Sequence, residues 1–574
     1  MIPCLLFSEN ESGIEWQKFD AAALAQARVE KKLVFLDVEA VWCHWCHVME
    51  KKTFSEPQVQ EALRKNFIST KLDQDSRPDL SRRYEAYGWP ALVILDPVTM
   101  RERVIGSGFQ TKEEFLALLK SGQNPNADIG MTKTSNPPST GALTADQKRS
   151  LLARLRDHYD PKATGWGSGS KFVPWGNIEY CIRLSENGDS AARKMAEDTL
   201  SSATRLIDPV WGGLYQYSTD DDWEHPHFEK IMEFEAEVSR AYALAYLARQ
   251  RPEDLQAAEA IVRHLHDFLR SPEGAYYVSQ DADIIPGEHS AEYFSKNDAE
   301  RRAIGIPRVD RHVYSRENGL AISALVTLYQ ATGKTAYLDD ATTAARWIIA
   351  NRALEGGGFS HDPSTASTPF LADQVYMGRA LLLLHQVTAD NEWLARASAC
   401  ADFCMKTFMR ESKDGGGFLS GPSLPDNPPP VVDRDENIEV ARWLNLMGKT
   451  TRESRFNKGA EHAMRYLADS GVVAEIYSFT GGLLLADEEI AGEPVHIAIV
   501  GNSKDPAAAA LFASAQKYPD SYKVIEWLTT SATDQSEIRF PDNDRSAAYL
   551  CSENRCSPPK FSAEELERSF RKTP

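Results

Sequence analysis

The stretch Leu33-Val34-Phe35-Leu36-Asp37-Val38-Glu39-Ala40-Val41-Trp42-Cys43-His44-Trp45-Cys46 joins an apolar run to a pair of cysteines. The apolar run predicts a buried strand, and the C-x-x-C stands where a helix is expected to begin, which is typical of a redox-active dithiol. The positive partial charge at a helix N-terminus favours a thiolate over a thiol. We therefore expect Cys43, at the exposed start of the helix, to attack a disulfide and Cys46 to resolve the product.

The sequence on both sides of this motif alternates between helix and strand patterns. Its last helix has a clear start signal, because Thr111 as N-cap and Glu114 three residues later form a capping box. The order of the elements predicts a thioredoxin arrangement for residues 1–122. The expected helices are 19–32, 44–65 and 111–120, and the expected strands are 33–38, 67–72, 91–95 and 103–107.

Two further residues are placed to assist the cysteines. Asp37 lies inside the apolar strand, six residues before Cys43, where it can exchange protons with the dithiol through water. Pro90 precedes strand 91–95, and a proline at this point is usually cis and packs beside the dithiol, shaping a groove for a peptide. The predicted catalytic residues are therefore Cys43, Cys46, Asp37 and Pro90, and the expected partner is a protein dithiol or disulfide.

The cysteine pair has three other interpretations. Cys43-His44-Trp45-Cys46-His47 matches the C-x-x-C-H of c-type haem attachment, but that requires export and the sequence shows no signal peptide. Zinc wants four converging ligands, and these neighbours cannot all converge, so any metal would need a partner elsewhere in the chain. The third interpretation is a pair of buried structural cysteines. We expect no metal and no cofactor.

Composition limits the classes of function. A chain of 574 residues is too long for one hydrophobic core, so two to four domains are expected. The net charge of −19 argues against nucleic acid or anionic membrane as a partner. Eight cysteines are too few for a disulfide framework, and the N-terminus lacks a basic region, so the expected compartment is the cytoplasm.

Residues 123–144 are rich in Gly, Asn, Pro, Ser and Thr and predict a linker, after which residues 145–490 show long helical patterns. Glycine-rich turns with aromatic or apolar edges recur through this part, with about two helices between successive turns. They predict an (α/α)6 toroid of helical hairpins, with an open solenoid or a plain bundle as alternatives. The six turns begin at Gly165, Gly212, Gly274, Gly356, Gly415 and Gly481.

Residues 491–574 return to an α/β pattern, with strands expected at 495–501, 523–528 and 547–551 and a helix at 506–516. This segment lacks the G-x-G-x-x-G fingerprint and is expected to be a small appended α/β unit. Cys551 and Cys556 are either a second dithiol, exchanging with the first, or two surface thiols.

Polar clusters in the helical part suggest a ligand site. In a toroid, the loops at one end line the central cavity, and paired carboxylates, histidines and aromatic rings there suit carbohydrate chemistry. A solvated turn or a satisfied polar network is the alternative for each cluster. The cavity candidates are His227, Glu229, Asp281, Asp283, Trp223, Glu317 and Asp373, with Tyr376 near the last of these.

The motif 42–49, the segments 76–80 and 88–90, and the later segments 217–220, 226–230, 280–283 and 548–551 resemble the spermatogenesis-associated, thioredoxin-like proteins over nearly the whole chain. The resemblance implies a thioredoxin-like domain fused to a six-hairpin glycosidase-type barrel similar to N-acylglucosamine 2-epimerase. It implies fold more strongly than function.

The leading hypothesis is a thiol–disulfide oxidoreductase joined to a barrel that binds or processes a carbohydrate-like ligand. One alternative is a sugar epimerase or glycosidase whose thioredoxin-like domain is only a scaffold or a redox switch. The other is a non-catalytic binding protein.

Overall fold

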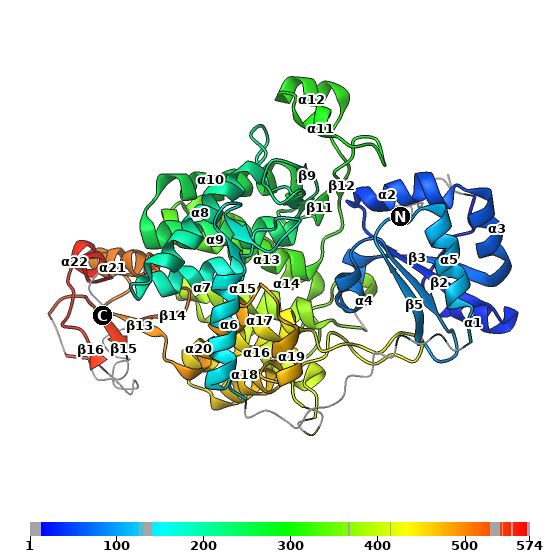
Figure 1. Ribbon diagram of the computed structural model, residues 1–574. Coiled ribbons are helices and arrows are strands. Elements are labelled where there is room, and N and C mark those ends of the chain that lie inside the picture. Colours follow the sequence, from blue (N-terminus) through cyan, green and yellow to red (C-terminus); the bar gives the residue numbers. More distant parts are fainter. Residues whose placement is uncertain are drawn as a thin grey trace.

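The computed structural model describes residues 13–125, 127, 129, 141–365, 368–411, 413, 415–528, 540–541, 544–552 and 555–570. An α/β domain (β1 to α5), a ring of helices (α6 to α20, the toroid) and a C-terminal sheet domain (β13 to α22) follow one another along the chain (Figure 1). The predicted fold class is confirmed. Residues 130–140 of the expected linker lie outside the described residues. Within the described ranges, no helix is both long and apolar enough to cross a membrane.

The α/β domain is built on one five-stranded sheet in the order β1-β3-β2-β4-β5. The apolar strand β2 lies inside the sheet, parallel to β3 and antiparallel to β4, which explains its near-continuous hydrophobic sequence. The strands are β1 Gln17–Lys18, β2 Leu33–Glu39, β3 Phe67–Asp73, β4 Ala91–Leu95 and β5 Glu102–Ser107, and the helices are α1 Ala21–Glu30, α2 His44–Met49, α3 Pro57–Asn66, α4 Pro78–Tyr84 and α5 Lys112–Gly122.

The prediction of one continuous helix over 44–65 is wrong. The helix after the dithiol, α2, passes into a π-helical turn at Glu50–Phe54 and ends, and α3 starts afresh with Pro57 in its first turn. Proline is favoured at a helix start and breaks a helix interior, so Pro57 marks this boundary. The predicted capping box of Thr111 and Glu114 at the start of α5 is confirmed.

The toroid consists of six inner and six outer helices. Each inner helix packs against the next one along the chain, and the last packs back against the first, so the ring is closed and the open solenoid is excluded. The outer helix α6, which comes first, pairs with the last inner helix, α20. The inner helices are α7 Trp175–Glu186, α9 Met232–Arg249, α13 Ser315–Thr332, α15 Leu371–Thr388, α17 Arg434–Thr451 and α20 Gly481–Ala491, and the outer ones are α6 Ala145–Asp157, α8 Ser190–Ala203, α10 Pro252–His264, α14 Thr335–Arg352, α16 Asn391–Phe408 and α18 Ser454–Leu467.

The recurring glycine turns connect an outer helix to the next inner helix. Several of their glycines have positive φ, which residues with a Cβ rarely adopt, and the turns that begin at Gly212, Gly274, Gly356 and Gly415 are each closed by one short β-bridge. The turn at Gly165 is closed instead by the strand pair β6 (Tyr159–Asp160) and β7 (Gly165–Trp166). The prediction of a sixth turn at Gly481 is wrong, because Gly481 and Gly482 begin the inner helix α20. All these connections therefore emerge at one end of the ring, where the inner helices begin. The bridged pairs are Ile207 with Leu214, Arg270 with Tyr276, Ala353 with Phe359 and Met409 with Phe418.

The C-terminal domain is a four-stranded sheet in the order β14-β13-β15-β16, with β13 Val495–Val500, β14 Lys523–Leu528, β15 Ala547–Ser552 and β16 Arg555–Cys556. Helix α21 (Pro506–Gln516) was predicted, whereas α22 (Ala563–Phe570) was not. Cys551 and Cys556 are disulfide-bonded across β15 and β16, while Asn554 between them lies outside the described residues. This sheet and the α/β domain occupy opposite ends of the molecule, which argues against exchange between the two cysteine pairs (Figure 1).

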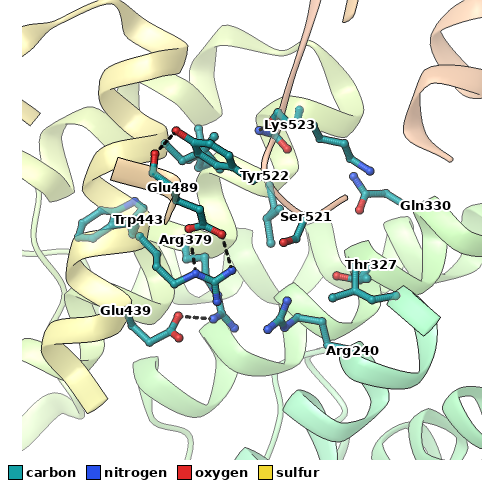
Figure 2. A pocket seen from close by; sticks show the side chains of 16 residues that line it. Arg240, Thr327, Gln330, Arg379, Glu439, Trp443, Glu489, Ser521, Tyr522 and Lys523 are labelled. Atoms are coloured by element: carbon teal, nitrogen blue, oxygen red, sulfur yellow. Dashed lines mark hydrogen bonds and ion pairs between the residues drawn. The ribbon is translucent and has the colours of Figure 1, made fainter. Parts of the chain in front are cut away.

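The start of β14 closes one end of the ring. Ser521, Tyr522 and Lys523 reach the inner helices beside a small cavity of about 70 Å³ (Figure 2). Arg379 pairs with Glu439 there at 2.6 Å, and the Tyr522 hydroxyl donates to the carbonyl oxygen of Glu489 at 2.6 Å. Ion pairs therefore occupy the central space of the ring at this end.

Candidate functional site

The cysteine pair occupies the first turn of α2. Cys43 is the N-cap residue, and its Sγ accepts a hydrogen bond from the backbone N–H of Cys46 at 3.1 Å. The two cysteines are joined as a disulfide with a Cα–Cα distance of 5.3 Å. In the reduced state, the same N–H group and the helix N-terminus would stabilise a thiolate on Cys43.

Asp37 lies in β2, the strand that leads to this turn, and Pro90 follows Trp89, which packs against the cluster that contains the cysteines. Asp37 is buried in β2, and burial together with the nearby charge of Glu39 raises its pKa well above the usual range, although Lys71 lies 3.9 Å away. Its Oδ1 has no hydrogen-bond partner within the described part of the chain, so Asp37 can carry a proton. The Trp89–Pro90 peptide bond is cis, as predicted.

The prediction that Cys43 is exposed is wrong. Only 3% of Cys43 and 4% of Cys46 is accessible, because the start of α9 packs over them. Ile231 belongs to the same buried cluster as the cysteines, and Phe234 and Trp89 pack against that cluster. The toroid therefore covers the surface where a peptide was expected to bind.

The two histidines of the C-x-x-C-H motif pair with carboxylates of the toroid. His44 Nδ1 lies 2.7 Å from Asp283 Oδ1, and His47 Nδ1 lies 3.1 Å from Asp283 Oδ2. Burial opposes ionisation, but hydrogen bonds from both histidines lower the pKa of Asp283 to about 2. Burial raises the pKa of Asp281 to about 7 against the field of His47, whose Nε2 is 3.8 Å away. Asp281 and Asp283 therefore lie at the junction between the two domains and not in the toroid cavity.

Donor atoms from His47, Asp281 and Asp283 all lie within 4.8 Å of one another, so these residues are able to hold a divalent cation. A second such group is Asp73, Asp310 and His312.

His227 and Glu229 lie beside the same junction. The His227 ring stacks on Tyr217 with centroids 4.4 Å apart, and its Nδ1 lies 3.7 Å from Glu229 Oε1. The His227 ring is 6.2 Å from that of Trp45 in the dithiol motif. The His227 ring therefore borders α2, and neither His227 nor Glu229 lines the large cavity between the toroid and the α/β domain.

The main cavity, of about 580 Å³, lies between the mouth of the toroid and the α/β domain. Its volume is in the range of small-molecule sites. Its walls combine aromatic rings with charged side chains from both domains. They include Trp42, Asp75, Arg82 and Trp89 of the α/β domain and Phe172, Trp175, Ile231, Glu233, Phe234, Arg316, Glu317, Tyr376 and Glu439 of the toroid.

The charges in this cavity are mostly paired. Arg316 contacts both Glu233 and Glu317, and Arg82 lies 3.3 Å from Glu233. Burial opposes ionisation, but the two arginines lower the pKa of Glu233 to about 2. Asp75 is different: burial raises its pKa to about 7, although Trp42 Nε1 donates to it at 2.7 Å. Asp75 therefore can hold a proton near neutral pH.

Of the remaining candidates, Glu317 lines the cavity, as does Tyr376. Asp373 is buried behind the cavity wall, 2.9 Å from His361 Nδ1, and accepts from the backbone of Arg316. Trp223 lies away from the cavity, because its Nε1 donates to the carbonyl of Ala163 in a buried position. Its role is packing beneath an exposed turn.

Sequence reasoning missed several cavity residues. Trp175, Glu233 and Arg316 each stand in the first turn of an inner helix, directly after one of the long connections. Their position in the sequence could have identified them, because the first turns of the inner helices lie at the mouth of a toroid. Asp75 and Arg82 gave no signal, since their contact with the cavity depends on how the domains dock.

Comparison with known proteins agrees with this architecture. The DsbH-type thioredoxin family, described as a protein of unknown function (DUF255), matches residues 3–116, and Glycosyl Hydrolase Family 88 matches residues 288–423. An uncharacterized protein of Caenorhabditis elegans is 21% identical over an alignment of 712 positions, covering 99% of this chain and 96% of that protein.

Spermatogenesis-associated protein 20 of Homo sapiens is 28% identical over 315 residues, which is 48% of this chain and 39% of the human protein. The match therefore spans less than half of the human protein. Thiol:disulfide interchange protein DsbD of Pseudomonas fluorescens is 38% identical over 78 residues, or 13% of each chain. Among solved structures, a D-mannose isomerase superposes with a TM-score of 0.48 and 13% identity, covering 62% of this chain and 99% of that one.

Proposed function

Because the chain is a relative of spermatogenesis-associated protein 20, with a thioredoxin-like domain and a six-hairpin-type toroid, we propose that it is a thiol–disulfide oxidoreductase whose toroid binds a carbohydrate-like ligand. The main support for the proposal is that residues next to the dithiol also line the cavity of the toroid. Trp42 and Trp89, which adjoin Cys43 and the cis-proline, also line the cavity of the toroid.

The redox half of the proposal rests on the first turn of α2. The Cys43 thiolate attacks one sulfur of a disulfide, forms a mixed disulfide and releases one thiolate. Cys46 gives its proton to Asp37 through water and attacks Cys43 Sγ, which releases the second thiolate and leaves the Cys43–Cys46 disulfide. Two electrons pass from the protein to the substrate.

The ligand half rests on the cavity. Aromatic faces such as Trp175, beside ion-paired carboxylates and arginines, suit a ring that carries hydroxyl groups. The match to a glycosyl hydrolase family supports the same ligand class. A hydrolase or epimerase activity would need a proton donor, and Asp75, with its pKa of about 7, is the favoured donor in this cavity.

A single-turnover assay tests the redox activity. The reduced, desalted protein is mixed with bis(2-hydroxyethyl) disulfide, and the released thiol is measured. We expect Cys43→Ser to lower the rate at least about a hundredfold and Cys46→Ser to accumulate the mixed disulfide, visible by mass spectrometry. Cys181→Ser, a buried free cysteine in α7, is the matched control. Reaction of Cys43→Ser at the wild-type rate would refute the proposal.

A further inference from the structure

We infer that the redox substrate is a small thiol or disulfide that itself carries a sugar or another polyol, and that it reacts from within the toroid cavity. This inference rests on the proposed function and narrows its substrate class. It unites two features that otherwise need separate explanations: a dithiol that is covered, and a cavity that lies directly beside it.

The surroundings of the dithiol and the lining of the cavity have side chains in common. Ile231 belongs to the buried cluster that contains Cys43 and Cys46, and it also lines the cavity. Phe234 packs against this cluster and also lines the cavity. In this proposal, rotamer changes at these side chains bring a cavity-bound sulfur to Cys43, and such changes are fast compared with domain motion.

A polypeptide, in contrast, would have to displace the toroid. Three connections of the ring hold the α/β domain in place by polar contacts, and of these three only the contact to Asp75 involves a residue that also lines the cavity. Asp283 binds both motif histidines, His361 Nε2 lies 2.7 Å from the carbonyl oxygen of Asp75, and Arg83 donates to the carbonyl oxygen of Pro429 at 3.0 Å. Breaking all of these contacts costs far more than moving Ile231.

The cavity selects for hydroxyl groups over net charge. Its arginines are already paired with carboxylates, as Arg316 is with Glu233 and Glu317, so a strongly charged ligand would meet no free counter-charge from these pairs. The paired groups keep unused lone pairs and N–H groups that can bond hydroxyls. Trp175, held edge-on by Phe234 at 5.8 Å, offers a ring face for stacking.

The chemical step is two-electron exchange. For a symmetric disulfide RS–SR, Cys43 bonds to one sulfur and RS⁻ leaves; Cys46 then bonds to Cys43 and the second RS⁻ leaves, each taking up a proton. Dithiothreitol serves as the external reductant that restores the protein dithiol in the assay below.

The test measures the rates at which the protein reduces bis(β-D-glucopyranosyl) disulfide and bis(2-hydroxyethyl) disulfide. Each rate is divided by the rate at which dithiothreitol alone reduces the same disulfide. We expect the normalised kcat/KM to be at least about tenfold higher for the glucosyl disulfide. In Trp175→Ala the ratio should fall to about 1, while Trp347→Ala, on the outer helix α14, keeps the wild-type ratio.

Equal normalised rates for the two disulfides in the wild-type protein would overturn this inference and leave the proposed function standing. A sugar preference that survives in Trp175→Ala would also overturn it, because the cavity would then not be the source of selectivity. Failure to reduce either disulfide would instead refute the proposed function itself.

Discussion

At the scale of single residues, the junction between the domains is an arrangement of carboxylates with opposite electrostatic surroundings. The Asp283 carboxylate is hydrogen-bonded to two histidines, whereas the buried Asp75 carboxyl accepts a hydrogen bond from the neutral indole of Trp42. The sequence singled out both the C-x-x-C-H histidines and the Asp281–Asp283 segment. It could not pair them, because His44 and Asp283 are 239 residues apart and nothing local links them.

Asp283→Asn should destabilise the protein at neutral pH. The folded pKa of about 2 lies below the ordinary 3.8, so the carboxylate stabilises the fold above about pH 4, and this contribution is lost as the pH falls toward 2. We expect a loss of ~2 kcal/mol in the free energy of unfolding at pH 6. Urea denaturation at pH 6 and pH 3 measures it, and an equal loss at both values would contradict the assignment.

Asp75→Asn should have the opposite pH dependence. The folded pKa of about 7 lies above 3.8, so the folded state holds a proton that the unfolded chain releases, and stability falls as the pH rises from about 4 to 7. Asn keeps an acceptor for Trp42. The variant should gain up to ~4 kcal/mol at pH 8 and nothing at pH 4, by the same denaturation assay. A loss of stability at pH 8 would show that Asp75 is ionised.

At the scale of elements, the sequence predicted what local patterns determine. The longer strands, the capping box at Thr111 and the bridged glycine turns follow from residue spacing, whereas two-residue strands such as β1 were not predicted. Closure of the ring does not, because it depends on the contact of α20 with α7, whose sequences are far apart. That contact is made through glycines: a Cβ at Gly481 would collide with the carbonyl oxygen of Gly176.

Gly481→Ala should therefore destabilise the toroid by ~1–3 kcal/mol, since backbone atoms on α7 must move to admit the methyl group. Gly482→Ala is the matched control. Its Cβ would lie 3.4 Å from the Ile438 side chain, and alanine favours a helix, so stability should stay equal or rise by up to ~1 kcal/mol. Thermal denaturation measures the melting temperatures of both variants. Equal melting temperatures would show that the ring still closes with a wider spacing between α20 and α7.

At the scale of the whole molecule, the toroid sits on the active face of the thioredoxin-like domain. The sequence predicted an exposed Cys43, because exposure was judged from the first domain alone. Cys43 is buried because Ile231 and Phe234, at the start of α9, pack on the cysteines, while Asp283 binds His44 of the same motif, and no local pattern encodes this docking. We therefore infer that this dithiol serves small molecules and excludes proteins.

The most direct test compares how fast the reduced protein cleaves insulin and bis(2-hydroxyethyl) disulfide. Each rate is divided by the rate at which dithiothreitol alone cleaves the same substrate. If the toroid must move off the cysteines before insulin can react, and this opening costs ~3 kcal/mol of free energy, the normalised rate for insulin will be about a hundredfold lower than the rate for the small disulfide. Insulin cleaved as fast as the small disulfide would contradict the account, because the toroid would then not shield the cysteines.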